Sequence, residues 1–277
     1  MIEAIASFFG MIIRFIYELV NNNYFVSIII FTILTKLILF PLSLGQIKST
    51  EEIKKIAPKE KQIKEKYKND KNKQAEELTK LYAEHKINPL GGCLPLLLQL
   101  PIILGMFYIV RQPLTYITQT PTEQIQQYTQ EVLGKETVTE TDMNNNQLVV
   151  AKEKGLIDMQ VFPGFNLGDV PANVFSKDPN KKASPLALLI PILTIVFSVI
   201  QNKMMMKSSS MSDEQKEMQK SMNLMMPIFS AFIAYTMPLA LGVYWLLGNI
   251  WQIGQQMVIT KIIQKDEEKL ALGKGGE

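Results

Sequence analysis

The sequence predicts an all-α polytopic membrane protein, with five transmembrane helices around a hydrophilic groove open to the cytoplasm and a helical hairpin in the cytoplasm. Three observations favour this class. Apolar residues gather in blocks of about 20, long enough for a helix to cross a bilayer core about 30 Å thick. Lysines gather between the blocks, and polar residues recur along one face of several blocks.

The apolar blocks define five candidate spans. Pro238 and Gly242 lie near the middle of the last apolar run, which is too long for one helix, so we expect a tight hairpin there. The predicted spans are residues 24–44, 89–110, 185–203, 222–240 and 241–262.

The charged segments between the spans predict the orientation. Residues 45–88 and 204–221 are rich in lysine, and short lysine-rich loops stay in the cytoplasm. Residues 111–184 hold more acidic than basic side chains, so we expect them outside the cell. We therefore expect a multi-pass protein of the plasma membrane, with its N-terminus outside and its short tail, 263–277, in the cytoplasm.

The first 23 residues are apolar but contain Glu3, Arg14 and Glu18. They lack the basic start and the small-residue cleavage site of a secretory signal peptide. A sixth span would have to bury Arg14, whereas an amphipathic helix at the outer interface of the membrane leaves it near water. We therefore favour an interfacial helix over residues 1–23.

Residues 45–88 carry an apolar stripe in each half, and the turn sequence KNDKNK separates the halves. One narrow stripe per half favours an antiparallel hairpin of two helices over a solvated charged loop. Pro58 should kink or interrupt the first helix. Residues 118–160, rich in Thr, Gln, Glu and Asn, are expected to be weakly folded or flexible. The stripes are Ile53, Ile56, Ile63 and Tyr67 in one half and Ala75, Leu78 and Tyr82 in the other.

Lys36 is the single charged side chain of the first predicted span. It precedes Leu44 by eight residues, which is about 12 Å into the membrane at about 1.5 Å per residue. A lysine at the centre of a membrane helix costs about 2.5–3.5 kcal/mol. No acidic residue lies in any predicted span to neutralise it, so hydration is the least costly arrangement.

Polar residues three, four or seven positions apart share a helix face, and they form stripes in three of the spans. Such residues are often only interhelical contacts, worth about 0.6 kcal/mol each. The aligned stripes and Lys36 together favour a hydrated groove that attracts carboxylates of an incoming polypeptide. The candidate groove residues are Thr32, Lys36, Gln99, Ser198, Gln201, Trp245, Asn249 and Gln252.

Several classes of function lack the residues that they need. The chain has no nucleotide-binding P-loop, no GxGxxG sequence and no HExxH sequence. His85 is the only histidine and Cys93 the only cysteine, which leaves no catalytic triad, internal disulfide or cysteine-based metal site. We expect no enzyme activity, cofactor or metal, and the near-neutral tail predicts no direct nucleic-acid binding.

Three stretches resemble signatures of the YidC family of membrane protein insertases. LTKLILFPLSLGQIKST (34–50) resembles the first span and its exit, NPLGGCLPLLLQLPIILGMFYIV (88–110) the second span, and MMPIFSAFIAYTMPLALGVYWLLGNIWQIGQQ (225–256) the last two. The resemblance implies a five-helix core whose groove is open to the cytoplasm and to lipid. It also implies a chaperone-like insertase that inserts and helps fold integral membrane proteins, alone or beside the Sec translocon.

The family's groove arginine corresponds to Lys36, so the charge is kept but the planar bidentate fork is lost. The implied partners are nascent membrane proteins, the lipid bilayer, the Sec translocon, and a ribosome or targeting receptor at the 45–88 hairpin. Two alternatives remain. One is a small-solute or ion transporter with Lys36 as its coupling charge, although no internal repeat is seen. The other is a structural partner of a larger translocon.

Overall fold

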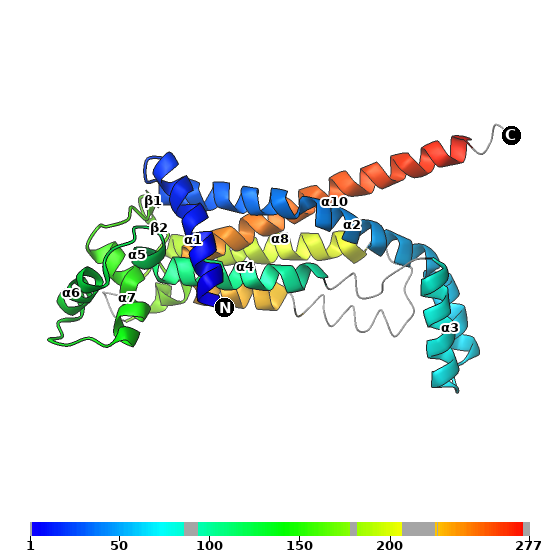
Figure 1. Cartoon of the computed structure of the whole chain (residues 1–277), viewed down its shortest axis with the longest axis horizontal. Helices are drawn as coiled ribbons and strands as arrows, with labels where there is room; N and C mark the ends of the chain where they lie inside the picture. Colours follow the sequence, from blue (N-terminus) through cyan, green and yellow to red (C-terminus); the bar gives the residue numbers. More distant parts are fainter. Residues whose placement is uncertain (1, 86–93, 178–181, 207–224, 226, 274–277) are drawn as a thin grey trace. The chain divides into compact units, whose positions relative to one another are not determined.

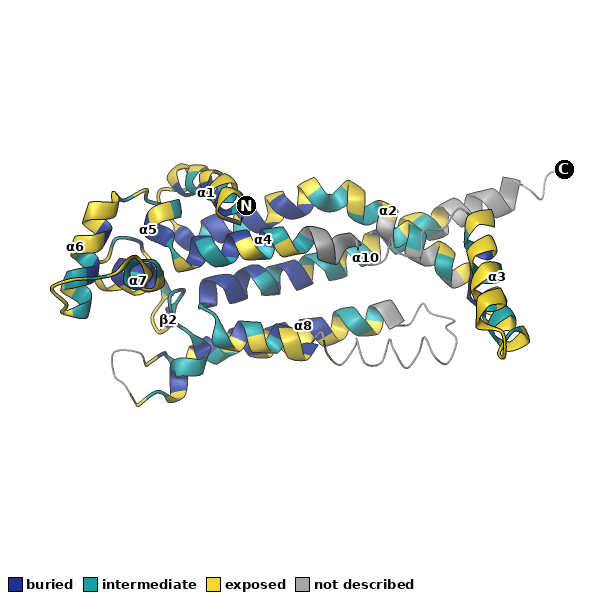
Figure 2. Cartoon of the chain, turned by 60° about the horizontal axis from the view of Figure 1, so that its bottom comes forward, coloured by how far each residue is buried: buried dark blue, intermediate teal, exposed yellow. Residues whose placement is uncertain are grey.

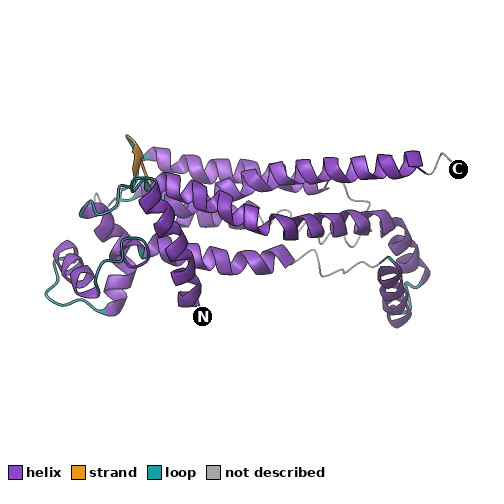
Figure 3. Cartoon of the chain, turned by 45° about the horizontal axis from the view of Figure 1, so that its top comes forward, coloured by secondary structure: helices purple, strands orange, loops and turns teal. Residues whose placement is uncertain are grey.

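The computed structural model describes residues 2–85, 94–177, 182–206, 225 and 227–273, and these are overwhelmingly helical (Figure 3). The only strands in these ranges are β1 (Gln160–Phe162) and β2 (Phe165–Asn166), which pair antiparallel. The all-α class is therefore confirmed for the part of the chain that the structure describes.

The chain divides into two compact units, and each is described by itself. Figure 1 labels the elements in chain order. Helices α2, α4, α8 and α10 each contribute residues to both units. The first unit is Met1–Lys36, Leu98–Val196 and Ile228–Gly248, and the second is Leu37–Leu97, Phe197–Pro227 and Asn249–Glu277.

The first predicted span lies in α2 (Tyr24–Lys66), which has no break at residue 44. The helix passes through Pro41 and Pro58 without ending, so Pro58 does not interrupt it, and a kink at Pro58 stays a prediction. Two apolar stretches, Tyr24–Ser49 and Pro185–Met204, are long enough to cross a membrane among the described residues. The second of these contains the short 3-10 helix η3 (Pro185–Leu188) and most of α8 (Leu189–Met206).

Shorter apolar helices lie in the second and fourth predicted spans, and the fifth lies in a longer helix. Gln99–Arg111 belongs to α4 (Leu94–Arg111), and Pro227–Thr236 lies in the fourth span. The helix of the fourth span ends at residue 236, residues 237 and 238 are not helical, and α10 (Leu239–Gly273) begins directly after them. This break lies where Pro238 predicts it. Residues 86–93 and 207–224, which include most of the 204–221 loop, lie outside the described residues.

The N-terminal segment forms helix α1 (Ile2–Leu19). Gly10 lies so close to the short helix α5 (Pro113–Tyr116) that an added Cβ would come 3.2 Å from the Tyr116 Cβ. Phe8 and Phe15 are exposed on another face. The turn into α2 places Asn21 and Asn22 at positive φ, which asparagine tolerates better than most residues.

The segment expected to be weakly folded contains two helices instead, α6 (Thr122–Leu133) and α7 (Glu140–Glu153), so that prediction is wrong. Helix α6 ends at Gly134, whose φ of 63° is the left-handed conformation that glycine adopts readily. Thr139 and Asp142 form a capping box that begins α7. Its Gln147 is buried, and Figure 2 shows further buried residues on α7. Capping and a buried face outweigh the polar composition.

In the second unit, the C-terminal part of α2 packs against α3 (Lys71–Glu84). Asp70 caps α3 by accepting the Lys73 N–H at 3.0 Å, as the KNDKNK turn suggests. The Gln74 amide donates to the Lys64 carbonyl at 3.0 Å and links the two helices. The small apolar core of this pair consists of Ile53, Ile56, Ile63, Leu81 and Tyr82.

Candidate functional site

Three helices of the first unit bring a lysine, an amide and a phenol together. Lys36 Nζ, on α2, donates to Gln99 Oε1 on α4 at 3.1 Å. Gln99 Nε2 in turn donates to the Tyr244 hydroxyl on α10 at 2.9 Å. The chain Lys36–Gln99–Tyr244, which we call the polar cluster, thus joins residues far apart in the sequence.

The polar cluster buries its charge. Only 8% of Lys36 is exposed, and no carboxylate lies within ion-pair distance of its Nζ among the described residues. An ammonium group has three donors, and the Gln99 carbonyl satisfies one of them. The remaining hydrogen-bonding capacity is available to water or to an anionic ligand, and an anion would gain most from this site.

Gly248 leaves the space through which Lys36 extends. A Cβ added to Gly248 would lie 3.5 Å from Lys36 Cε and 3.6 Å from its Nζ. Gly248 and Tyr244 are four residues apart on α10 and therefore share a helix face. Sequence reasoning missed both, since it followed the neighbouring face that begins at Trp245.

Thr32 is 1% exposed, and its hydroxyl donates to the Ile28 carbonyl of its own helix at 2.6 Å. Thr35 is buried in the same way, with its hydroxyl 3.0 Å from the Phe31 carbonyl. Both hydroxyl protons are therefore directed to their own helix, so neither residue offers a free donor to a ligand.

Four predicted groove residues pair with one another in the second unit. The Asn249 amide on α10 donates to the Ser198 hydroxyl on α8 at 3.0 Å, and Gln201 donates to Gln252. Both pairs join the same two helices. These polar residues therefore make hydrogen bonds between helices, as expected of polar residues that serve as interhelical contacts.

Trp245 lies beside the polar cluster in sequence but contacts a different neighbour. Its ring packs edge-on against Phe229, with the centroids 6.3 Å apart. The described part of the chain contains no group of three or more His, Cys, Asp or Glu side chains that could hold a metal ion. Lys36, Gln99 and Tyr244 offer charge and hydrogen bonding.

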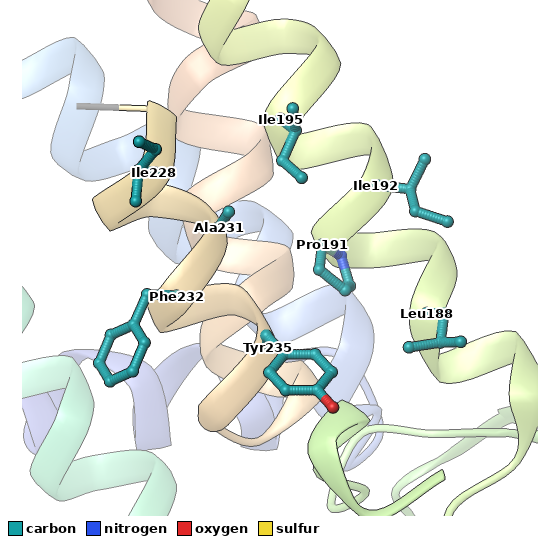
Figure 4. A pocket seen from close by; sticks show the side chains of 8 residues that line it. All are labelled: Leu188, Pro191, Ile192, Ile195, Ile228, Ala231, Phe232 and Tyr235. Atoms are coloured by element: carbon teal, nitrogen blue, oxygen red, sulfur yellow. The ribbon is translucent and has the colours of Figure 1, made fainter. Parts of the chain in front are cut away.

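An open apolar groove of about 440 Å³ lies on the first unit, between α8 and the 227–236 helix (Figure 4). Ile192 and Ile195 line it from one helix, and Ile228 and Phe232 line it from the other. All four side chains are more than 40% exposed. An exposed apolar surface of this kind is typical of a membrane, ligand or protein interaction site.

The comparisons with known proteins agree on one family. A family model described as "60Kd inner membrane protein" matches residues 15–267. A protein of Fusobacterium nucleatum, named membrane protein insertase YidC, is 32% identical over 240 residues, which is 87% of each chain. Proteins of the same name from Clostridium tetani and Caldanaerobacter subterraneus are each 30% identical, over 95% and 93% of this chain and 94% of their own.

Proposed function

Because this chain belongs to the YidC family of membrane protein insertases, it acts in inserting membrane proteins, and we propose that the polar cluster is where it first holds them. Lys36 would form a transient ion pair with an acidic residue in the part of the substrate that must cross the membrane. The apolar part of the substrate would then enter lipid.

The observation that carries this proposal is the partner of Lys36. A buried ammonium held by one neutral amide has its charge uncompensated, so an arriving carboxylate gains more here than it would in water. A resident aspartate or glutamate would neutralise the lysine and compete with the substrate. The amide of Gln99 orients the ammonium without competing for it in that way.

The neutral partner also keeps binding reversible. Release requires the carboxylate to exchange its ion pair for water, and a hydrogen bond to a charged group is worth about 1.5–3 kcal/mol. That amount favours capture by roughly 10- to 150-fold without trapping the substrate. The energy for insertion itself comes from burial of the substrate's apolar segment in lipid, at about 0.8 kcal/mol per buried methylene.

The exposed apolar faces of α8 and the 227–236 helix offer a path into lipid. The five-span topology, with a cytoplasmic groove, the N-terminus outside and the C-terminus inside, is part of the same proposal. So are the Sec translocon as a partner and the α2–α3 hairpin as a contact for a ribosome or targeting receptor. The lysine-rich composition of the hairpin supports its cytoplasmic location.

Reconstitution into liposomes tests the proposal. The substrate is a single-span protein whose translocated tail carries one aspartate, and its matched control has asparagine there. We expect Lys36→Ala to lower insertion of the aspartate substrate about tenfold or more, with little effect on the asparagine substrate. Lys36→Arg should retain insertion because it keeps the charge. Equal insertion of the aspartate substrate by the wild-type protein and the Ala variant would contradict the proposal.

A further inference from the structure

The first turn of α10 is capped by main chain from a distant segment of the first unit. The Leu239 N–H donates to the Asp169 carbonyl at 2.8 Å, and the Ala240 N–H donates to the Leu167 carbonyl at 2.9 Å. The first N–H groups of a helix have no partner inside the helix, so these two bonds satisfy donors that would otherwise be orphaned. Leu239 and Ala240 are fully buried, so water does not supply the bonds instead.

The side chain of Asp169 anchors this cap to α7. It is 9% exposed, and its Oδ1 accepts from Lys152 Nζ at 2.7 Å. Gly168 lets the loop lie close to its neighbours, because an added Cβ would come 3.0 Å from the Met159 sulfur and 3.2 Å from Asn166 Oδ1. One residue, Asp169, thus holds α10 through its carbonyl and α7 through its carboxylate.

The capped turn leads directly to the polar cluster. Tyr244 follows Leu239 by five residues, about 7.5 Å along the helix axis. Between them lies Gly242, where an added Cβ would come 2.7 Å from Ile190 Cγ2 on α8. Close packing and the cap together fix the start of α10, and the start of α10 fixes the position of the Tyr244 hydroxyl.

We propose that the Lys152–Asp169 ion pair positions the substrate-holding cluster. By fixing the first turn of α10, it keeps the Tyr244 hydroxyl where it accepts the Gln99 amide, which leaves the Gln99 carbonyl turned toward Lys36. Without the pair, α10 loses its anchor to α7, and the Lys36 ammonium loses its orientation while keeping its charge. This inference rests on the proposed role of Lys36 in substrate capture.

Lys152→Met and Asp169→Asn test this in the full-length protein, with the aspartate and asparagine substrates described above. We expect a two- to fivefold loss of insertion for the aspartate substrate, no larger than the loss from removing the Tyr244 hydroxyl itself, and little change for the asparagine substrate. Lys152→Arg should restore insertion because it keeps the ion pair. The matched control is Lys154→Met, which removes the exposed ion pair between Lys154, the residue that follows α7, and Glu131 on α6.

A second comparison separates a positioning role from a structural one. In a Lys36→Ala background, Lys152→Met should cause no further loss, because the residue on which it acts is gone. An equal loss for both substrates, the same loss in the Lys154→Met control, or full activity of Lys152→Met would each overturn the inference. Full activity of Lys36→Ala would overturn the proposed function itself, so the two failures are distinguishable. Thermal unfolding of each variant in detergent verifies that it is folded.

Discussion

Lysine occurs in two contrasting settings in this molecule. In the α2–α3 hairpin of the second unit, lysines are exposed and pair with acids one helical turn away, as Lys80 does with Glu76 at 2.7 Å and Glu77 at 3.0 Å. In the first unit, Lys36 is 8% exposed and bonds to a neutral amide. The charges of the hairpin thus lower the folding stability little, whereas the single charge of the polar cluster lowers it considerably.

The difference indicates where selection for function acts. Exposed helical ion pairs contribute little to stability and are readily replaced. A buried lysine without a carboxylate opposes folding, since its desolvation is not offset by a countercharge. An arrangement that destabilises the protein and yet is built from three helices is expected at a functional site.

The largest expected effect comes from removing the costly charge. Lys36→Met keeps much of the side-chain volume and eliminates a buried ammonium, so we expect thermal stability to stay equal or to rise. Insertion of an acidic substrate should nevertheless fall about tenfold or more, by loss of a charged hydrogen bond worth about 1.5–3 kcal/mol. Unfolding in detergent and insertion into liposomes measure the two quantities. A variant that loses stability and activity in parallel would remove the contrast between the two regions.

The next effect concerns the space beside the charge. At Gly248 an alanine Cβ would make ordinary contact with Lys36 at 3.5 Å, whereas a leucine side chain would occupy the volume through which the lysine extends. We therefore expect Gly248→Leu to reduce insertion of acidic substrates severalfold and Gly248→Ala to have a small effect. Equal activity of the two variants would show that Lys36 does not need this space.

A smaller effect is expected from the hydroxyl at the end of the polar cluster. Tyr244→Phe leaves the Gln99 amide without its acceptor, and an unsatisfied buried donor costs about 1–3 kcal/mol. Gln99 would then turn to find another partner and would orient Lys36 less well. We expect a two- to fivefold loss of insertion, restricted to acidic substrates. A loss shared by neutral substrates would assign Tyr244 to general stability.

The smallest expected effect is the change in stability of the α2–α3 hairpin with pH. A hydrogen bond from Lys80 holds the pKa of Glu76 below its ordinary value of 4.5, and hydrogen bonds to Glu76 and Glu77 raise the pKa of Lys80 above its ordinary value of 10.5. The contribution of Glu76 to the stability of the hairpin is therefore complete above about pH 4.5 and is lost as the pH falls further. The contribution of Lys80 to that stability is complete below about pH 10.5 and is lost as the pH rises.

Amide hydrogen exchange of α3 in the full-length protein measures this effect. After correction for intrinsic exchange, protection should form a plateau between about pH 5 and pH 10 and decline slightly at both ends. Lys80→Ala should flatten the two declines and leave insertion unchanged. A large loss of insertion in this variant would mean that a hairpin ion pair, like Lys36, is functional.

The sequence allowed the charged residue to be predicted but not the way in which it is held. Lys36 was predicted because a lone charge in an apolar run is rare, and Gln99 because it is the polar residue of its span. Gly248 carries no side chain and gave no signal. The role of Asp169 rests on its main-chain carbonyl, which no sequence pattern reveals. Residues 118–160 were predicted to be weakly folded or flexible because their polar composition does not show that Gly134 and Thr139 cap two helices there.

The most direct test of the central claim is a zero-length crosslink between Lys36 and a substrate carboxylate. A membrane-permeable carbodiimide joins an amine to a carboxylate only when the two are in contact. With a stalled substrate whose translocated tail carries one aspartate, peptide mass spectrometry should find an amide bond between that aspartate and Lys36. The asparagine substrate should not give this product. Crosslinks from hairpin lysines to the substrate, with none from Lys36, would contradict the account.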